Sequence, residues 1–309
     1  MTSTPQSLHG VIPPVVTPLH PDRSIDTASL ERLVRFLLDA GVHGLFVLGS
    51  SGETAYLTDS QRDTVLDVVV ATAAGEVPVL AGCVETTTGR VIERARMAEK
   101  VGADALVATA PFYTRTHPAE IDRHFRAVRA AVDLPLVAYD VPVSVHVKLS
   151  VDLLATLAQD GVVDAVKDSS GDDAAFRQLL LRTADLPNFA ALTGHEVVVD
   201  AMLLAGAHGV VPGLGNVDPH GYVRLYEACR AGDWAAAKAE QDRLARLFSI
   251  VEAASPATAS GSTAGIGSFK AALALRGVIA DATPALPMRP LDEDETAEVR
   301  RVLVRAGLL

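Results

Sequence analysis

Short apolar segments recur along the chain at intervals of roughly 25–30 residues, separated by polar and amphipathic stretches. Each segment is almost continuously apolar, which is typical of parallel strands covered on both faces by other elements. We therefore expect a series of short, buried strands. The eight predicted strands are Val11–Thr17, Gly44–Gly49, Pro78–Cys83, Ala105–Thr109, Leu136–Tyr139, Val162–Lys167, Phe189–Thr193 and Gly209–Pro212.

The stretches between these strands carry apolar residues at helical spacing. Residues that favour helix starts precede several of them, as at Thr58 and Ser150. Glycines such as Gly41 and Gly161 stand where the helices are expected to end. The clearest apolar stripes are Leu30, Leu33, Val34, Leu37 and Leu38, then Val65, Leu66, Val69 and Val70, and then Ile121, Phe125, Val128 and Val132.

Eight strand–helix units in series predict an α/β fold of the (β/α)8 TIM-barrel type. A doubly wound sheet is the competing α/β architecture. It is disfavoured by the number of strands and because no Gly-x-Gly-x-x-Gly turn follows the first strand.

The C-terminal quarter of the chain has a different pattern, in which helical stretches follow one another without strands between them. We expect residues 1–231 to form the barrel that carries the site, and residues 232–309 to form a helical appendage packed on it. The stretch 253–265, rich in Ala, Ser, Thr and Gly, is predicted to be a loop. The predicted helices here are Tyr222–Ala231, which closes the barrel, and Trp234–Val251, Gly267–Gly277 and Asp292–Ala306.

Composition narrows the class of protein. The 309 residues are 49% hydrophobic and 21% charged, so the chain can bury a large core and is not of the disordered type. The net charge is −11 and no basic stripe is present, which argues against a nucleic-acid partner. No segment resembles a membrane span or a signal peptide, and Cys83 and Cys229 lie in apolar stretches. We expect a cytoplasmic protein with two reduced thiols.

Candidate reactive groups follow the predicted strands, at the end of a barrel where active sites form. Lys167 ends the sixth strand. Tyr113 follows the fourth strand and Tyr139 ends the fifth. The segment Gly49–Glu53 follows the second strand, and its sequence Gly-Ser-Ser-Gly-Glu predicts a tight turn whose N–H groups and hydroxyls can hold a carboxylate.

This set of side chains suits Schiff-base catalysis. A lysine must be neutral to attack a carbonyl, and burial in an apolar barrel favours the neutral amine. Attack on a 2-oxo acid gives a carbinolamine and then an imine, which stabilises an adjacent carbanion or enamine. The proton transfers need a relay, and a tyrosine bridged by a serine hydroxyl can supply one.

The segments Gly49–Glu53, Tyr139–Pro142 and Val166–Asp172 together resemble the dihydrodipicolinate synthase / N-acetylneuraminate lyase family of class I aldolases. The resemblance covers nearly the whole chain. It implies that Lys167 forms the imine and that Tyr139 shuttles protons.

The resemblance assigns roles to further residues. It implies that Ser51 links Tyr139 to Tyr113, which would reach across a tight dimer interface. It also implies a homodimer or homotetramer, with neither a cofactor nor a metal ion beyond the covalent lysine imine. The substrate-binding residues expected for the 2-oxo acid are Gly49, Ser50, Ser51, Ser169, Glu196 and Val211.

Three positions depart from the well-known members. Dihydrodipicolinate synthases resemble one another in an arginine where this chain has Ser144, and a serine cannot replace a guanidinium that binds a carboxylate through two hydrogen bonds. The sugar-binding residues of the lyase branch are matched by Glu196, whereas Val197 and Gly213 replace the others. The residues for pyruvate activation are therefore present, and those for the second substrate fit neither member.

Four functions remain open from the sequence. The first is a pyruvate-dependent class I aldolase, lyase or dehydratase acting on a 2-oxo (2-keto-3-deoxy) acid, with an aldehyde as a possible second partner. The second is 4-hydroxy-tetrahydrodipicolinate synthase, with Arg115 as an alternative cationic grip. The third is a non-catalytic protein that binds a 2-oxo acid. The fourth is a metal-dependent aldolase, which the spacing of the histidines, including His195, does not support.

Overall fold

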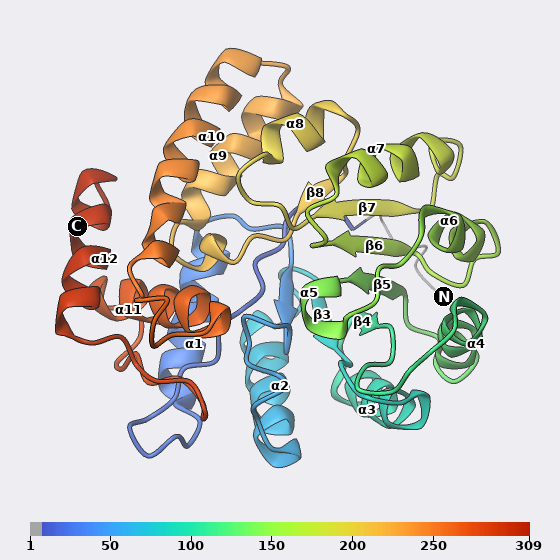
Figure 1. Cartoon of the computed structure of the whole chain (residues 1–309), viewed down its shortest axis with the longest axis horizontal. Helices are drawn as coiled ribbons and strands as arrows, with labels where there is room; N and C mark the ends of the chain where they lie inside the picture. The colour runs from blue at the N-terminus through green and yellow to red at the C-terminus, as the bar shows by residue number, and fades with distance from the viewer. Residues whose placement is uncertain (1–7) are drawn as a thin grey trace.

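A computed structural model describes residues 8–309, and its centre is a sheet of eight short parallel strands (Figure 1). The hydrogen-bonded order is β1-β8-β7-β6-β5-β4-β3-β2, so each strand from β2 onward pairs with the next one along the chain. This order confirms the predicted (β/α)8 barrel. The strands are β1 (Gly10–Val11), β2 (Leu45–Val47), β3 (Val79–Gly82), β4 (Ala105–Thr109), β5 (Leu136–Asp140), β6 (Ala165–Asp168), β7 (Ala190–Thr193) and β8 (Gly209–Val210).

The ring closes between β1 and β2 through irregular hydrogen bonds. The predicted strand Val11–Thr17 forms a ladder only at Gly10–Val11 because Pro13 and Pro14 have no N–H to donate. Beyond the ladder, the N–H of Val15 donates to the carbonyl of Phe46 at 2.8 Å. The N–H of Phe46 donates to the carbonyl of Pro13 at 3.0 Å. These bonds join the first and second strands and complete the barrel.

Helices cover the outside of the strands, as the apolar stripes predicted. The stripe residues Leu30, Leu33, Val34 and Leu37 are completely buried. Within residues 8–309, no helix is both long enough and apolar enough to cross a membrane. The helices that follow the strands are α1 (Thr27–Asp39), α2 (Asp59–Ala73), α3 (Thr88–Val101), α4 (Pro118–Arg129), α6 (Val151–Gln159), α7 (Asp173–Arg182), α8 (Val199–Leu204) and α9 (Pro219–Arg230), with the short α5 (Pro142–Val145) after β5.

The C-terminal helices lie on one side of the ring, next to α1 (Figure 1). They are α10 (Trp234–Phe248), α11 (Ser268–Leu275) and α12 (Glu293–Arg305). The predicted loop 253–265 is less irregular than expected, because its end turns into a π-helical segment, η3 (Thr263–Gly267), that leads directly into α11. A 3₁₀ turn, η2 (Ser249–Glu252), ends the helix predicted as Trp234–Val251.

The register of β5 and β6 sets the geometry of the site. Tyr139 pairs with Lys167 in the ladder, and Asp140 pairs with Asp168. Side chains alternate between the two faces of a strand, so Tyr139 and Lys167 point to the same face. Tyr139 belongs to the buried cluster inside the barrel, together with Phe46 of β2. The fold thus brings a lysine, a phenol and a phenyl ring together at the carboxyl ends of the strands.

Candidate active site

Lys167 is buried at the end of β6, with only 5% of its surface exposed. Its Nζ lies 4.0 Å from the centroid of the Tyr139 ring and 4.8 Å from the centroid of the Phe46 ring. Throughout residues 8–309, no carboxylate lies within 4.0 Å of this amine. A buried lysine normally has a carboxylate partner. Lys167 is instead held between aromatic rings, which leaves its amine available to a ligand.

The phenol of Tyr139 is poised for proton transfer. Burial raises the pKa of this phenol, but the charge of Lys167 and hydrogen bonds involving Ser50, Lys167 and Ser169 outweigh burial. The net effect is a pKa of Tyr139 below its ordinary value. Because the optimal pKa of a general acid or base lies closer to neutral pH than that of a free phenol, this shift favours proton exchange at Tyr139.

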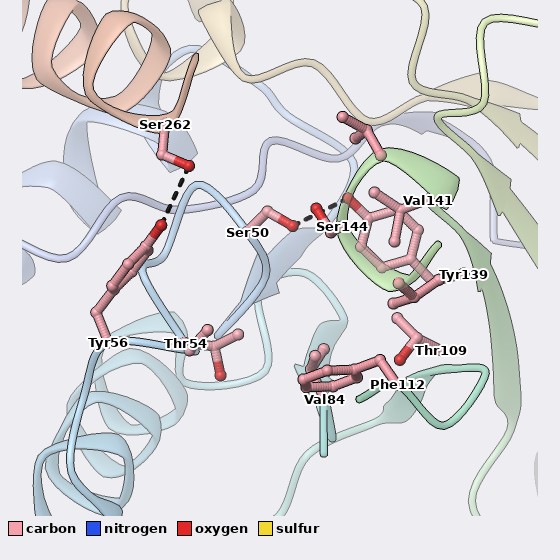
Figure 2. Close-up of a pocket in the computed structure, with 13 residues that line it drawn as sticks. Ser50, Thr54, Tyr56, Val84, Thr109, Phe112, Tyr139, Val141, Ser144 and Ser262 are labelled. Carbon is pink, nitrogen blue, oxygen red and sulfur yellow. Dashed lines mark hydrogen bonds between the residues drawn. The ribbon is translucent and has the colours of Figure 1, made fainter. Parts of the chain in front are cut away.

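The turn after β2 supplies the hydroxyl nearest to this phenol. The Oγ of Ser50 lies 3.3 Å from the Tyr139 hydroxyl (Figure 2). The sequence analysis gave the linking role to Ser51. In the structure, Ser50 is the serine that lies next to Tyr139 and lines the cavity, and Ser51 is not among the residues that line it. Gly49 is required here, since a Cβ at this position would lie 2.5 Å from the Phe46 ring.

A cavity of about 310 Å³ opens above Tyr139 (Figure 2). On the side opposite Tyr139, the hydroxyl of Tyr56 donates to the Oγ of Ser262 at 3.1 Å, so the C-terminal part completes the wall. Lys167 is not a wall residue and lies against the ring of Tyr139. None of the lining side chains carries a formal charge. The described lining residues are Ser50, Thr54, Ala55, Tyr56, Val84, Thr109, Phe112, Tyr139, Val141, Val143, Ser144, Val145 and Ser262.

Glu196, after β7, is held by protein donors. Its carboxylate accepts hydrogen bonds from the N–H of Gly213 at 2.9 Å, the N–H of Leu214 at 2.8 Å and the hydroxyl of Tyr222 at 3.0 Å. Burial raises the pKa of Glu196 to about 7, although these donors and the charge of Lys167 act in the opposite direction. Gly213 has no room for a side chain, because a Cβ would lie 2.7 Å from the Phe269 ring.

The remaining expected substrate-binding residues lie in different surroundings. Ser169 is among the groups that lower the pKa of Tyr139, and Gly194 makes room for Ser169, because a Cβ on Gly194 would lie 2.2 Å from the Ser169 Oγ. Val211 is buried in the same inner cluster as Tyr139. Both are therefore close to the phenol.

Tyr113 does not reach the site of its own chain. Its side chain is 96% exposed, and its backbone has the left-handed φ of +66°. A non-glycine residue rarely adopts this conformation, and a bulky residue there is strained. The turn therefore presents a tyrosine to the outside of the protomer.

Glu53 anchors the turn after β2 to the C-terminal part. Its carboxylate forms a fully buried ion pair with Lys270 of α11 and accepts a hydrogen bond from the N–H of Ala285 at 2.7 Å. The same amine of Lys270 donates to the carbonyl of Thr283 at 2.9 Å. These contacts make Glu53 an anchor of the turn.

Several site residues gave no signal in the sequence. Tyr56 and Ser262 are more than 200 residues apart, and nothing in either local pattern indicates that they meet. His195, named as a possible ligand, has its Nδ1 3.0 Å from Asp173, in a pair outside the cavity lining. Within residues 8–309, histidine, cysteine, aspartate and glutamate side chains form no group of three or more that could hold a metal ion.

Comparison with known proteins agrees with this geometry. The sequence model of the dihydrodipicolinate synthetase family matches residues 7–306. An uncharacterised DapA-like lyase of Halobacterium salinarum is 38% identical over 99% of this chain and 96% of its own. A 4-hydroxy-tetrahydrodipicolinate synthase of Phenylobacterium zucineum is 35% identical over 97% of this chain and 98% of its own.

A solved structure is similar over the same extent. YagE, a prophage protein of the dihydrodipicolinic acid synthase family from E. coli K12 crystallised in complex with pyruvate, superimposes with a TM-score of 0.91. It is 29% identical to this chain, and the match covers 98% of this chain and 99% of YagE.

Proposed function

Because the chain belongs to the dihydrodipicolinate synthetase family and is thus a class I, pyruvate-dependent lyase, we propose that Lys167 forms a Schiff base with pyruvate or another 2-oxo acid. The observation that carries this proposal is the position of the amine. It is buried, it has no carboxylate partner, and it lies 4.0 Å from the centroid of a phenol ring. That arrangement is unfavourable for a structural lysine and suitable for a nucleophile.

The reaction requires a route for protons. The amine of Lys167 attacks the C2 carbonyl of the 2-oxo acid to give a carbinolamine, and loss of water gives the imine. Tyr139 would donate the proton that leaves with the water, and Ser50, 3.3 Å away, would carry protons between Tyr139 and the cavity. The protonated imine then accepts the electron pair of the C3–H bond while the Tyr139 phenolate left by the previous step takes the proton, which gives the enamine. The imine itself serves as the electron sink, so the proposal includes no external cofactor.

The turn after β2 is the proposed binding site for the substrate carboxylate. The Oγ of Ser50 in this turn lies 3.3 Å from the Tyr139 hydroxyl, and consecutive N–H groups of a tight turn form a concave donor site for an anion. Ser51, which does not line the cavity next to Tyr139, would bind the substrate carboxylate and would not take part in proton transfer. Gly49 allows the close packing of Phe46 beneath the turn.

The uncharged cavity favours an uncharged second partner. Six of its thirteen lining residues, besides Tyr139, carry a hydroxyl, and none is ionic. Removing a charged group from water without an ionic partner is costly, whereas hydroxyl groups can exchange hydrogen bonds with such a wall. We propose a neutral, hydroxylated aldehyde as the product of cleavage or the acceptor in synthesis. The corresponding cleavage substrate is a 2-keto-3-deoxy acid.

The names of several relatives, the Phenylobacterium protein among them, favour a 4-hydroxy-tetrahydrodipicolinate synthase. Aspartate semialdehyde carries a carboxylate that needs a cationic grip. Ser144 lines the cavity where the resemblance places an arginine, and Arg115 is exposed and outside the lining. The geometry therefore favours the neutral aldehyde.

We further propose that a second copy of the chain supplies Tyr113. The side chain points into solvent from a strained turn, and the neighbouring Phe112 lines the cavity. A dimer in which each Tyr113 enters the cavity of its partner would bury this phenol and add a third hydroxyl to the route formed by Tyr139 and Ser50.

Borohydride trapping tests the central proposal. Reduction in the presence of saturating pyruvate should add one pyruvate-derived group to the intact chain, and peptide mapping should place it on Lys167. The Lys167→Ala chain should stay unmodified, while Lys238→Ala, which removes an exposed lysine of α10, should react as the native chain does. An unmodified native chain would refute Schiff-base formation. Trapping without turnover of any aldehyde or 2-keto-3-deoxy acid would indicate a binding protein.

A complementation assay tests the dimer. Mixtures of the Lys167→Ala and Tyr113→Phe chains should regain part of the activity that each lacks alone, because half of the sites in a mixed dimer receive both residues. No recovery after subunit exchange, or a monomer by light scattering, would contradict the role of Tyr113.

A further inference from the structure

Two buried carboxylates lie behind the proposed catalytic pair. Asp140 directly follows Tyr139 on β5, and Asp168 directly follows Lys167 on β6. The two aspartates are partners in the ladder, and their exposed fractions are 0% and 6%. Because side chains alternate along a strand, the aspartates point to the opposite face of the sheet from Tyr139 and Lys167. Tyr139 and Lys167 therefore form an inner pair, and the residues that directly follow them, Asp140 and Asp168, form an outer pair on the other face of the same two strands.

The outer pair requires a counter-charge. Like charges at opposite ladder positions repel each other, and low exposure strengthens the repulsion. Lys148, in the segment between α5 and α6, forms an ion pair with Asp140, and its Nζ lies 3.5 Å from the Oδ2 of Asp168. Across residues 8–309, no other lysine, arginine or histidine comes within 4.0 Å of either carboxylate.

The second oxygen of each carboxylate is held by uncharged donors. The N–H of Leu149 donates to the Oδ1 of Asp140 at 3.1 Å. The N–H and Oγ of Ser170 donate to the Oδ1 of Asp168 at 2.8 and 2.7 Å. These donors fix each carboxylate next to its own strand end, so only Lys148 connects the two strands through an ion pair.

The ionisation of this group depends on Lys148. Burial and the neighbouring Asp168 raise the pKa of Asp140, and Lys148 opposes both effects. Burial lowers the pKa of Lys148, but the two aspartates outweigh burial and the net pKa is raised. The amine therefore stays protonated and keeps the outer pair bridged at neutral pH.

We propose that Lys148 is a positioning residue, which bridges Asp140 and Asp168 and thereby keeps Tyr139 of β5 against the amine of Lys167 on β6. Lys148 does not line the cavity, so it acts through the strand ends and not on the substrate. The inference rests on the proposed Schiff-base function for its catalytic consequence. Its structural part, the spacing between Tyr139 and Lys167, does not depend on that function.

The variant Lys148→Met tests the bridge, because methionine keeps most of the aliphatic stem and removes the charge. The maximal rate of pyruvate trapping by borohydride should fall by about 10- to 100-fold, since small displacements of catalytic groups cost this much. The half-saturating pyruvate concentration should change little, because the turn after β2 is untouched. Lys148→Arg should restore the rate.

The double variant Asp140→Asn/Lys148→Met separates charge balance from simple packing. It leaves one carboxylate between the strands, and the side-chain carbonyl of the new amide can still accept a hydrogen bond from the N–H of Leu149. The trapping rate should recover most of the loss. Equal impairment of the single and double variants would refute the inference, and so would a native rate in Lys148→Met.

A spectroscopic measurement needs no activity at all. The ionisation of Tyr139 is obtained as the difference between the ultraviolet pH titrations of each chain and of its Tyr139→Phe counterpart. If loss of the bridge separates Tyr139 from Lys167, the pKa of Tyr139 should rise in Lys148→Met. In the double variant, the pKa of Tyr139 should stay at the native value. An unchanged pKa would overturn the proposal even if trapping were impaired. Failure of the native chain to trap pyruvate would refute the proposed function alone, because this titration would still decide the role of Lys148.

Discussion

Two lysines are buried among residues 8–309, and they have opposite surroundings. Lys270 of α11 is fully buried and forms an ion pair with the fully buried carboxylate of Glu53. Lys167 of β6 is almost as buried, yet it lies against the rings of Tyr139 and Phe46 and has no carboxylate within 4.0 Å among the described residues. The same side chain type thus occurs once with its charge compensated and once without.

The difference separates a structural role from a chemical one. A carboxylate that pairs with an amine favours the ammonium form and occupies its hydrogen-bonding positions. Aromatic rings stabilise a cation more weakly and leave its protons free to move. Position at the end of a barrel strand is therefore less informative than the identity of the neighbours, and substitutions at the two lysines and at residues around them test this contrast.

The largest expected effect is on imine formation. Lys167→Met should abolish trapping and lower any turnover by at least about 10⁴-fold, because no other group can form the imine. Lys270→Met should keep trapping per folded molecule, since Lys270 is remote from the 2-oxo acid in this proposal. Intact-mass measurement after borohydride reduction checks both. Trapping that persists in Lys167→Met and disappears in Lys270→Met would reverse the assignment of the two lysines.

The next largest effect is on stability. Lys270→Met leaves Glu53 buried without its partner, which should lower the free energy of unfolding by about 3–5 kcal/mol. The double variant Glu53→Gln/Lys270→Met should recover much of the loss, because neither charge remains. Lys167→Met should not destabilise the protein, since it removes no ion pair. Urea denaturation measures all three, and a double variant as unstable as the single one would show that packing, not charge, dominates.

Loss of the phenol should have a smaller catalytic effect. Tyr139→Phe keeps the ring against Lys167 and removes the hydroxyl, so turnover should fall by about 10²- to 10⁴-fold, the range for general acid–base catalysis. Trapping should be slower but still reach Lys167. Single-turnover kinetics with pyruvate checks this, with Tyr226→Phe, at the other end of the barrel, as the control. Native rates in Tyr139→Phe would remove the phenol from the proton route.

The smallest effect concerns Glu196. Its folded-state pKa of about 7 lies above the ordinary value of 4.5, so the folded state binds this proton more tightly than the unfolded chain does. The resulting stabilisation is complete below about pH 4.5 and is lost as the pH rises through about 7. Glu196→Gln should flatten this part of the dependence of the unfolding free energy on pH.

The same titration distinguishes the two lysines. The charge of Lys167 lowers the pKa of Glu196, whereas Lys270 is not among the largest influences on it. Lys167→Met should therefore raise the upper end of the pH window in which this stabilisation is lost. Lys270→Met should leave that window unchanged. Denaturation at a series of pH values between 5 and 9 measures the window. Identical windows in the native and Lys167→Met chains would show that Lys167 has no electrostatic influence at this carboxylate.

Most of the fold could be predicted from the sequence, because buried parallel strands and amphipathic helices have different periods. The predicted strand Ala105–Thr109 has the same bounds in the structure, and β5 differs by one residue. The first strand was too long, since Pro13 and Pro14 replace ladder bonds by irregular ones. The end of the predicted loop 253–265 is helical, because burial of Thr263 and Ile266 overrides a weak local preference.

Site residues could be predicted from the sequence only where a residue at the end of a strand indicates the chemistry by its type and position alone. Lys167 and Tyr139 are such residues, and the barrel rule places them at the same end. A sequence gives the order of Ser50 and Ser51 but not the direction of either side chain, so it could not show that Ser50 is the one next to the phenol. The ion pair of Lys148 with two strand ends, and the contact of Tyr56 with Ser262, depend on tertiary structure alone.

The contact between Tyr56 and Ser262 has a consequence for biosynthesis. A ribosome that has translated all eight strands has produced Lys167 and Tyr139 but not yet Ser262, Lys270 or Ala285, which complete the wall and anchor the turn after β2. A nascent chain at that stage lacks the part of the cavity wall formed by Ser262 and the anchor formed by Lys270 and Ala285. The cavity can therefore be completed only after residues well beyond the last barrel strand have been translated.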